Sequence, residues 1–231
     1  MKIITPEILF EDSNIIVVKK PAGIPTQTKS FSSPDMEKIL KNHLVKSAVE
    51  KGQKLSNPYL AVIHRLDQPV SGILVFAKDA KSAAALNRQL QARGFGKCYL
   101  ALVNKAPSKN EGDLHDYLVK DARSNTSRVC EKTTAGAKAA DLHYKIVSLD
   151  SELGETAKRV WGNEISSTLL EVILGTGRHH QIRVQLSSMG CPIEGDTKYG
   201  GAAVSDRTLK LCAYKLEFRH PATGKTLKFQ L

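Results

Sequence analysis

The chain has 231 residues, of which 41% are hydrophobic and 25% are charged, and this composition is that of an ordinary globular protein. It excludes a disordered chain, a collagen, a coiled-coil rod and a disulfide-stapled mini-protein. Lys and Arg total 34 against 23 Asp and Glu, so the formal net charge is +11, which favours a polyanionic partner, nucleic acid before anionic membrane. Four scattered cysteines lack metal-ligand spacing and indicate free thiols in the cytoplasm.

The first hundred residues predict several strands and two helices. Apolar runs on both sides of a polar turn predict a hairpin over residues 8–18. After a polar loop at 26–33, apolar residues at helical spacing predict a helix over 35–51. A second helix is expected after Asp79, which can cap its first turn, and Gly94 would end it. Further strands are expected over residues 60–66, 72–77 and 97–103.

Strand patterns dominate the rest of the chain, with one more helix expected from about residue 178 to Gly190. The polar stretch 150–163 is expected to be a surface hairpin or loop. Since strands outnumber helices and neighbouring strands are close in sequence, we expect an α+β fold. Its central sheet would be mixed and largely antiparallel, with flanking helices and a cleft. The remaining strands are expected over 114–119, 137–149, 169–174, 210–218 and 226–229.

Segment 62–72 is the most unusual stretch of the sequence. An expected strand ends in polar residues, and Pro69 and Gly72 then force a turn before the next apolar strand. Asp67 therefore lies at a strand end, where a rigid scaffold can hold a catalytic group in a fixed geometry. Asp also commonly starts turns, so the residues alone leave a structural role equally open.

Segment 175–184 places two glycines before a helix rich in cationic and amide side chains, which suits the binding of an anion. His179 and Arg183 are four residues apart and are expected to share one helix face. A solvated basic face is the alternative. The paired histidines lack the spacing and the neighbouring acids of a metal site, so we expect no metal.

The strand expected at 97–103 would place Lys97, Tyr99 and Ala101 on one face. Tyr99 can be a core tyrosine or an aromatic platform for a nucleic-acid base. The segment alone does not decide between these roles.

Together the three segments resemble the RluA-type family of pseudouridine synthases. His64-Arg65-Leu66-Asp67 with Ser71-Gly72 resembles the family's catalytic motif, and Lys97-Cys98-Tyr99-Leu100-Ala101 its tyrosine motif. Gly177-Arg178 with His180-Gln181-Ile182-Arg183 resembles its arginine motif. The resemblance extends over residues 7–231 and includes the flanking pieces Lys20-Pro21-Ala22-Gly23, Gly195-Asp196, Tyr199-Gly200 and His220-Pro221.

The resemblance implies isomerisation of uridine to pseudouridine in tRNA or rRNA, without a cofactor or a metal. It assigns Asp67 as the catalytic carboxylate, Arg183 as its ion-pair partner and Tyr99 as the residue placed against the target base. Whether the carboxylate attacks covalently or removes a sugar proton stays open. The target nucleotide must leave its stack. The residues expected to contact RNA are Arg65, which would hold the opened site, and His64, Lys97, Arg178 and His179.

Departures from the family pattern are Val70, where a threonine is common, and Gln185, where a histidine is common and RNA contacts would change. No S4-type RNA-binding module is recognised, so we expect one catalytic domain over residues 1–231, and a monomer. The lysine-rich segment 26–58 can bind RNA or simply cover the fold.

The same residues are compatible with two other functions. A catalytically inactive RNA-binding or RNA-folding factor could use the same scaffold, although it would have no chemical need for the aspartate. A glycosidase-like hydrolase would need a second acid near Asp67, for which Asp79 and Asp196 are the candidates.

Overall fold

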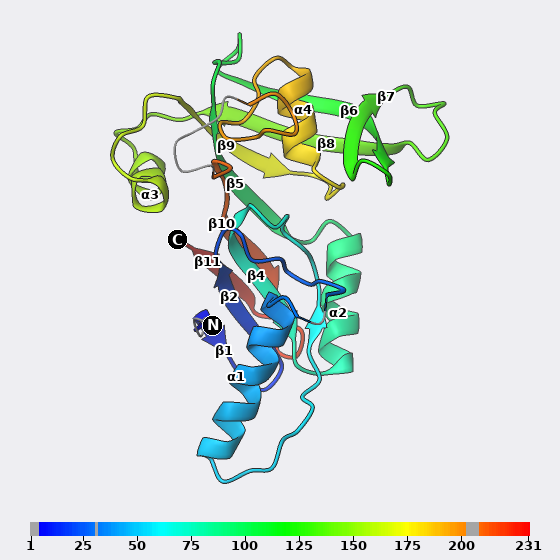
Figure 1. Cartoon of the computed structure of the whole chain (residues 1–231), viewed down its shortest axis with the longest axis vertical. Helices are drawn as coiled ribbons and strands as arrows, with labels where there is room; N and C mark the ends of the chain where they lie inside the picture. Colours follow the sequence, from blue (N-terminus) through cyan, green and yellow to red (C-terminus); the bar gives the residue numbers. More distant parts are fainter. Residues whose placement is uncertain (1–4, 31, 202–207) are drawn as a thin grey trace. The chain divides into compact units, whose positions relative to one another are not determined.

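A computed structural model describes residues 5–30, 32–201 and 208–231, so that residue 31 of the expected loop lies outside the described part. The chain divides into two compact units, residues 1–96 with 213–231, and residues 97–212. It passes between them in strands β5 (Gly96–Val103) and β10 (Leu211–Arg219), as Figure 1 shows. The expectation of one catalytic domain over the whole chain therefore stays a prediction.

The first unit is built on a sheet in the order β1-β2-β4-β10, with β3 beside β4 and β11 beside β10. The predicted hairpin is confirmed, because β1 and β2 pair antiparallel. The strand expected over 60–66 is much shorter and includes only Ala61–Val62. The bounds of these strands are β1 (Glu7–Glu11), β2 (Ile15–Lys20), β3 (Ala61–Val62), β4 (Ser71–Ala77) and β11 (Thr226–Gln230).

Both faces of strands β2 and β4 are buried, which explains why their sequences are almost continuously apolar. Helix α2 (Ala80–Gln91) packs on β4, and Asp79 caps it as predicted, since its Oδ1 accepts the Ser82 N–H at 2.8 Å. Helix α1 (Met36–Glu50) is capped in the same way by Asp35. The apolar side of α1 is buried through Met36, Leu40, Leu44 and Ala48.

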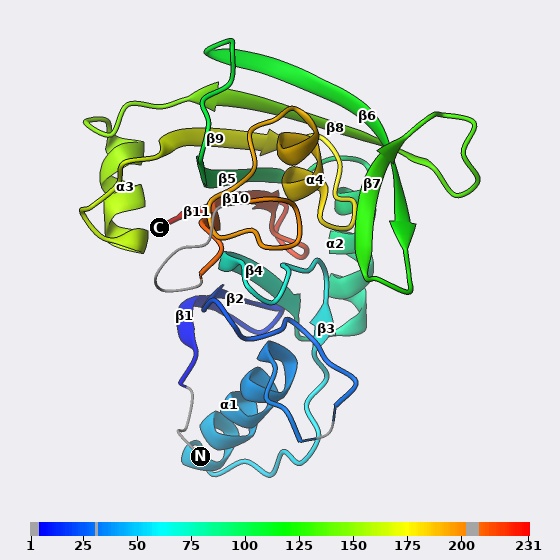
Figure 2. The same cartoon turned by 45° about the horizontal axis from the view of Figure 1, so that its top comes forward.

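The second unit contains the antiparallel strand order β5-β9-β8-β6-β7. Helix α4 (Gln181–Ser188) lies against this sheet, and Figure 2 shows it over the strands. Its Val184 packs with Leu118 and Ala140 of the sheet. The remaining strands are β6 (Glu111–Asp121), β7 (Thr126–Cys130), β8 (Lys138–Ile146) and β9 (Thr168–Leu174).

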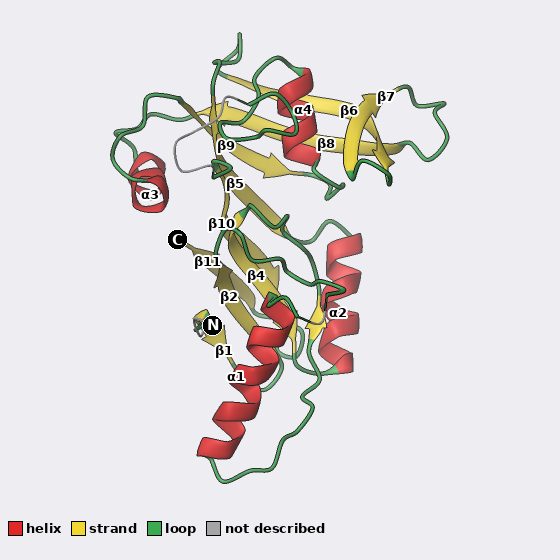
Figure 3. Cartoon of the chain, viewed as in Figure 1, coloured by secondary structure: helices red, strands yellow, loops and turns green. Residues whose placement is uncertain are grey.

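The expected loop at 150–163 is wrong, because residues Glu152–Trp161 form helix α3 (Figure 3). Ser151 caps its first turn by accepting the Gly154 N–H at 3.1 Å. Acidic residues lie in the first turn and basic residues in the last, which suits the helix dipole, and Gly162 ends the helix at φ 93°. Within the described residues, no helix is both long and apolar enough to cross a membrane.

Candidate active site

Asp67 lies at a turn whose two neighbouring residues are held by an earlier part of the chain. The Val70 N–H donates to the Asp67 carbonyl at 3.0 Å, which closes the turn. On one side, the buried Thr26 hydroxyl donates to the Leu66 carbonyl at 3.0 Å and accepts the Leu66 N–H at 3.2 Å. On the other side, the Gly23 N–H donates to the Gln68 carbonyl at 2.9 Å. The half-buried Asp67 therefore sits on a backbone fixed both before and after it.

Lys20 lies beside the Asp67 turn, and the sequence analysis treated it only as part of a flanking motif. Its fully buried Nζ donates to the carbonyls of Pro21 at 2.9 Å, Ile24 at 2.6 Å and Gln68 at 3.0 Å. Burial lowers the pKa of the Lys20 ammonium to about 8, and the nearby Asp67 charge offsets part of this effect. Lys20 therefore binds the turn and brings a positive charge near the Asp67 carboxylate. A lysine that ends an apolar strand just before Pro-Ala-Gly was the available signal.

Gly72 lets the segment after Asp67 enter strand β4. Its φ of +130° suits glycine, and a Cβ at this position would lie 2.3 Å from the Ala213 carbonyl oxygen. The close approach of these two backbones fixes the start of β4.

His64 and Arg65 have different surroundings. The His64 Nε2 lies 3.4 Å from the Val75 backbone nitrogen, and its ring meets Phe95 edge-on at 5.9 Å, so this side chain packs inside its own unit. The exposed Arg65 guanidinium donates to the side chain of Gln27, which itself donates to Glu37 at 2.7 Å. Arg65 is thus tethered to segment 26–58. The predicted RNA contacts of both residues stay predictions.

Arg183 belongs to the second unit and is buried on helix α4. Its Nε donates to Asp196 Oδ2 and its Nη2 to Asp196 Oδ1, both at 2.8 Å, with the two side chains 6% and 0% exposed. Its guanidinium carbon also lies 5.0 Å from the Tyr199 ring centroid. The sequence analysis did not identify Asp196 as the bidentate partner of Arg183. Asp67 belongs to the other compact unit, so its pairing with Arg183 stays a prediction.

Tyr99 lies on strand β5, where it is 7% exposed and faces Val172 of β9 across the ladder. The structure therefore places it in a buried strand of the second unit. Its meeting with Asp67 at a common base stays a prediction.

His179 does not lie on the helix as expected. Helix α4 starts only at Gln181, and His180 occupies its N-cap position with a left-handed φ of 54° and no side-chain capping hydrogen bond. The His179 ring stacks on His180 at 3.8 Å and pairs with the Ser127 hydroxyl of β7 at 2.9 Å. His180 in turn pairs with the Tyr199 hydroxyl at 2.7 Å. These contacts connect the start of α4 to the β6–β7 hairpin.

Lys97 and Arg178 form a cationic pair in the second unit. Burial lowers the pKa of Lys97, and the positive charge of Arg178 lowers it further. The Arg178 Nε donates to the Ala139 carbonyl at 2.8 Å, and its backbone N–H donates to Gln181 Oε1 at 2.9 Å. The arginine is therefore oriented while the residue as a whole is exposed.

Both candidates for the second acid of a hydrolase have structural partners. Asp79 caps helix α2, and Asp196 is bound to Arg183. Gln185 is also buried, and its amide nitrogen donates to Asp116 at 2.8 Å and to the Ala140 carbonyl at 3.2 Å. Its predicted effect on RNA contacts stays a prediction. Among the described residues, no three potential ligands gather into a metal site.

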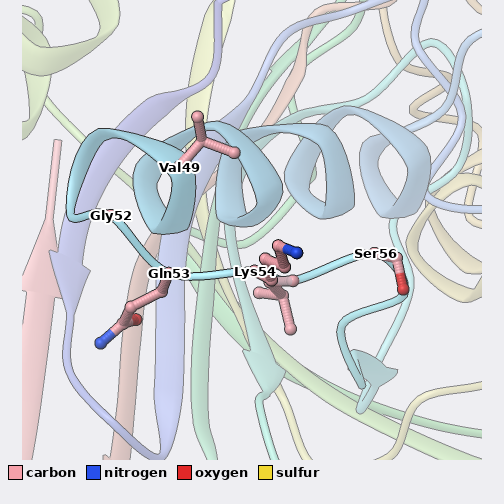
Figure 4. Close-up of a pocket in the computed structure, with 6 residues that line it drawn as sticks. Val49, Gly52, Gln53, Lys54 and Ser56 are labelled. Atoms are coloured by element: carbon pink, nitrogen blue, oxygen red, sulfur yellow. The ribbon is translucent and has the colours of Figure 1, made fainter.

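Segment 26–58 contributes one cavity of about 600 Å³ at the end of α1 (Figure 4). Its lining contains none of the motif residues. Lys41 pairs with Glu37 at 2.9 Å within α1, whose apolar side is buried. These contacts fit a helix that covers the fold. The cavity is lined by Val49, Gly52, Gln53, Lys54, Leu55 and Ser56.

A family model described as RNA pseudouridylate synthase matches residues 14–188, which include the whole of the catalytic and tyrosine motifs. The chain belongs to this family. The resemblance to its RluA-type members is confirmed by curated relatives. The chain is 32% identical over 219 residues to the dual-specificity RNA pseudouridine synthase RluA of Vibrio vulnificus, covering 93% of this chain and 78% of the relative.

Two other relatives are longer than this chain. Identity to the ribosomal large subunit pseudouridine synthase D of Nitrosomonas europaea is 33% over 236 residues, covering 97% of this chain and 61% of that protein. Identity to the uncharacterized RNA pseudouridine synthase YhcT of Bacillus subtilis is 30% over 221 residues, covering 96% and 66% respectively. The chain thus spans less than two thirds of these two pseudouridine synthases.

Solved structures show the same fold. The human RNA pseudouridylate synthase domain containing 4 has a TM-score of 0.72 at 24% identity, covering 97% of this chain and 87% of that one. For the human protein named domain containing 1, the TM-score is 0.73 at 18% identity, with coverages of 100% and 84%. The expected α+β fold is therefore confirmed.

Proposed function

We propose that this chain is an RNA pseudouridine synthase that isomerises specific uridines in ribosomal or transfer RNA, with Asp67 as the catalytic carboxylate. The observation that carries the proposal is the anchoring of Asp67. Hydrogen bonds from Thr26, Gly23 and Lys20 fix the backbone on both sides of it. A carboxylate on so rigid a turn is suited to act on one atom of a bound nucleotide.

In the proposed reaction the base is detached from the ribose, turned and rejoined through its C5. The Asp67 carboxylate acts on the target nucleotide as a nucleophile or as a base, and both roles need the ionised form. The Lys20 ammonium attracts that negative charge. Arg183 supplies the second cation, Tyr99 lies against the base, and the exposed Arg65 holds the RNA opened by flipping of the nucleotide.

The names of the relatives favour ribosomal RNA over transfer RNA as the substrate. One relative is named ribosomal large subunit pseudouridine synthase D, and the RluA relative is named dual-specificity. The net charge of +11 supports affinity for a polyanion. A cytoplasmic location and a monomeric state belong to the same proposal.

A tritium-release assay on ribosomal RNA labelled with [5-³H]uridine tests the activity, because loss of the C5 proton accompanies formation of pseudouridine. The Asp67→Ala variant should bind the RNA and release no tritium, whereas Asp113→Ala, which removes an exposed carboxylate of the second unit, should keep normal activity. Normal release by Asp67→Ala would refute the role of Asp67. A lack of release by the wild-type chain on both ribosomal and transfer RNA would favour an inactive RNA-binding factor. Release of free uracil would favour a hydrolase.

A further inference from the structure

Lys97 is a cation that the protein itself leaves uncompensated. It is half-buried at the start of strand β5, and it has no hydrogen-bond or ion-pair partner in the part of the chain that the structure describes. The charge that acts on it is that of Arg178, which has the same sign. Two like charges held in a partly desolvated place destabilise the protein unless an anion joins them.

The loop beside Lys97 approaches its ammonium closely at Gly177. A Cβ built at Gly177 would lie 3.3 Å from Lys97 Nζ, and no other heavy atom outside its chain neighbours lies within 4 Å. The φ of Gly177 is not in the left-handed region, so the backbone conformation does not require glycine there. The absence of a side chain at Gly177 therefore keeps the immediate surroundings of the Lys97 ammonium uncrowded.

Strand geometry relates this pair to the tyrosine motif. Lys97 and Tyr99 are two residues apart on β5, so they share a face and lie about 7 Å apart along the strand. That spacing is comparable to the distance between the base and the phosphate of one nucleotide. A base against Tyr99 would bring its own phosphate within reach of Lys97.

We propose that Lys97 and Arg178 form a phosphate-binding site for the nucleotide whose base lies against Tyr99. The inference rests on the proposed function, which places the target base at Tyr99. The Ala139 carbonyl orients the Arg178 guanidinium, which leaves its other N–H groups to bind phosphate oxygens. The Lys97 ammonium supplies the second contact from the strand, and Gly177 presents no side chain that would crowd this ammonium.

Binding of uridine 5′-monophosphate and of uridine to the full chain, measured by NMR titration, tests this site. Because a charge-assisted hydrogen bond changes affinity by about tenfold or more, the monophosphate should bind about tenfold more tightly than uridine. In Lys97→Met and in Arg178→Met the preference should fall to about twofold, and Lys97→Arg should restore most of it. Lys145→Met is the control, since Lys145 is an exposed lysine of the same unit that pairs with Glu111 at 3.7 Å.

An unchanged preference in Arg178→Met would overturn the site; Arg178 is exposed, and circular dichroism checks that this variant is folded. Equal binding of uridine and its monophosphate to the wild-type chain would also overturn it. Inorganic phosphate should compete with the monophosphate and not with uridine. A phosphate preference without tritium release from RNA would leave the site standing while refuting the proposed enzyme.

Discussion

Replacing Asp196 by asparagine tests the buried ion pair of the second unit. The two oxygens of Asp196 accept from Arg183 Nη2 and Nε, both at 2.8 Å. An asparagine must place its NH₂ group where one of these oxygens was. In either orientation, the NH₂ donor then faces an N–H donor of Arg183, and one hydrogen bond is lost. The guanidinium is only 6% exposed, so water cannot replace the lost acceptor.

The expected loss follows from this burial. Removing one partner of a buried ion pair costs about 3–5 kcal/mol, because the other charge stays desolvated. We expect about 3 kcal/mol for Asp196→Asn and about 5 kcal/mol for Asp196→Ala. At a urea dependence of about 2 kcal/mol per molar, these losses lower the unfolding midpoint by about 1.5 M for Asp196→Asn and by about 2.5 M for Asp196→Ala.

The chain offers a direct readout, because its single tryptophan, Trp161, lies in the same unit as the pair. Urea unfolding followed by Trp161 fluorescence should show the shift. Asp113→Asn is the control, since it breaks an exposed contact with His143 at 3.0 Å and should cost less than about 1 kcal/mol. Equal losses for Asp113→Asn and Asp196→Asn would refute the reasoning.

Three further predictions concern the first unit. Gly72→Ala should lower the free energy of unfolding by at least about 3 kcal/mol in urea, since its Cβ would overlap the Ala213 carbonyl; a loss below about 1 kcal/mol would contradict this. Thr26→Val should cost about 2–4 kcal/mol in the same assay, because it leaves the Leu66 N–H and carbonyl without the hydroxyl, and Thr26→Ser should restore stability. The folded pKa of Lys20, about 8, lies below its ordinary 10.5, so between these values the unfolded chain holds the proton that the folded chain has lost. The Lys20 contribution to stability should therefore rise from pH 8 to 10.5, and Lys20→Met should remove that slope in urea titrations against pH.

Elements that are encoded by local sequence patterns could be predicted from the sequence alone. Alternation and apolar runs located most strands, and Asp79 was recognised as a cap because its signal lies within one turn of α2. Helix α3 was missed because the stretch 150–163 is polar and was expected to be a surface hairpin or loop. It also carries Gly154 in its first turn, and glycine weakens a helix. The structure explains this glycine, because a Cβ there would lie 2.2 Å from the Leu149 carbonyl oxygen.

In the candidate site, too, the sequence predicts the motif residues but not the contacts that hold them in place. The motifs name Asp67 and Arg183, but they do not show what holds them. Thr26 and Leu66 are 40 residues apart, and their contact depends on tertiary folding that no local pattern encodes. Asp196 likewise follows Arg183 by 13 residues, and only the folded loop brings its carboxylate to the guanidinium.

The three hydrogen bonds from Lys20 Nζ to backbone carbonyls also affect how this lysine reacts with chemical labels. Amine-acylating reagents attack the free, unprotonated amine. The Lys20 Nζ is fully buried and hydrogen-bonded, so a reagent in solvent cannot reach it. Lys20 should remain unlabelled in the native chain while surface lysines react, and its first appearance in a mass-spectrometric footprint would mark opening of the turn that holds Asp67.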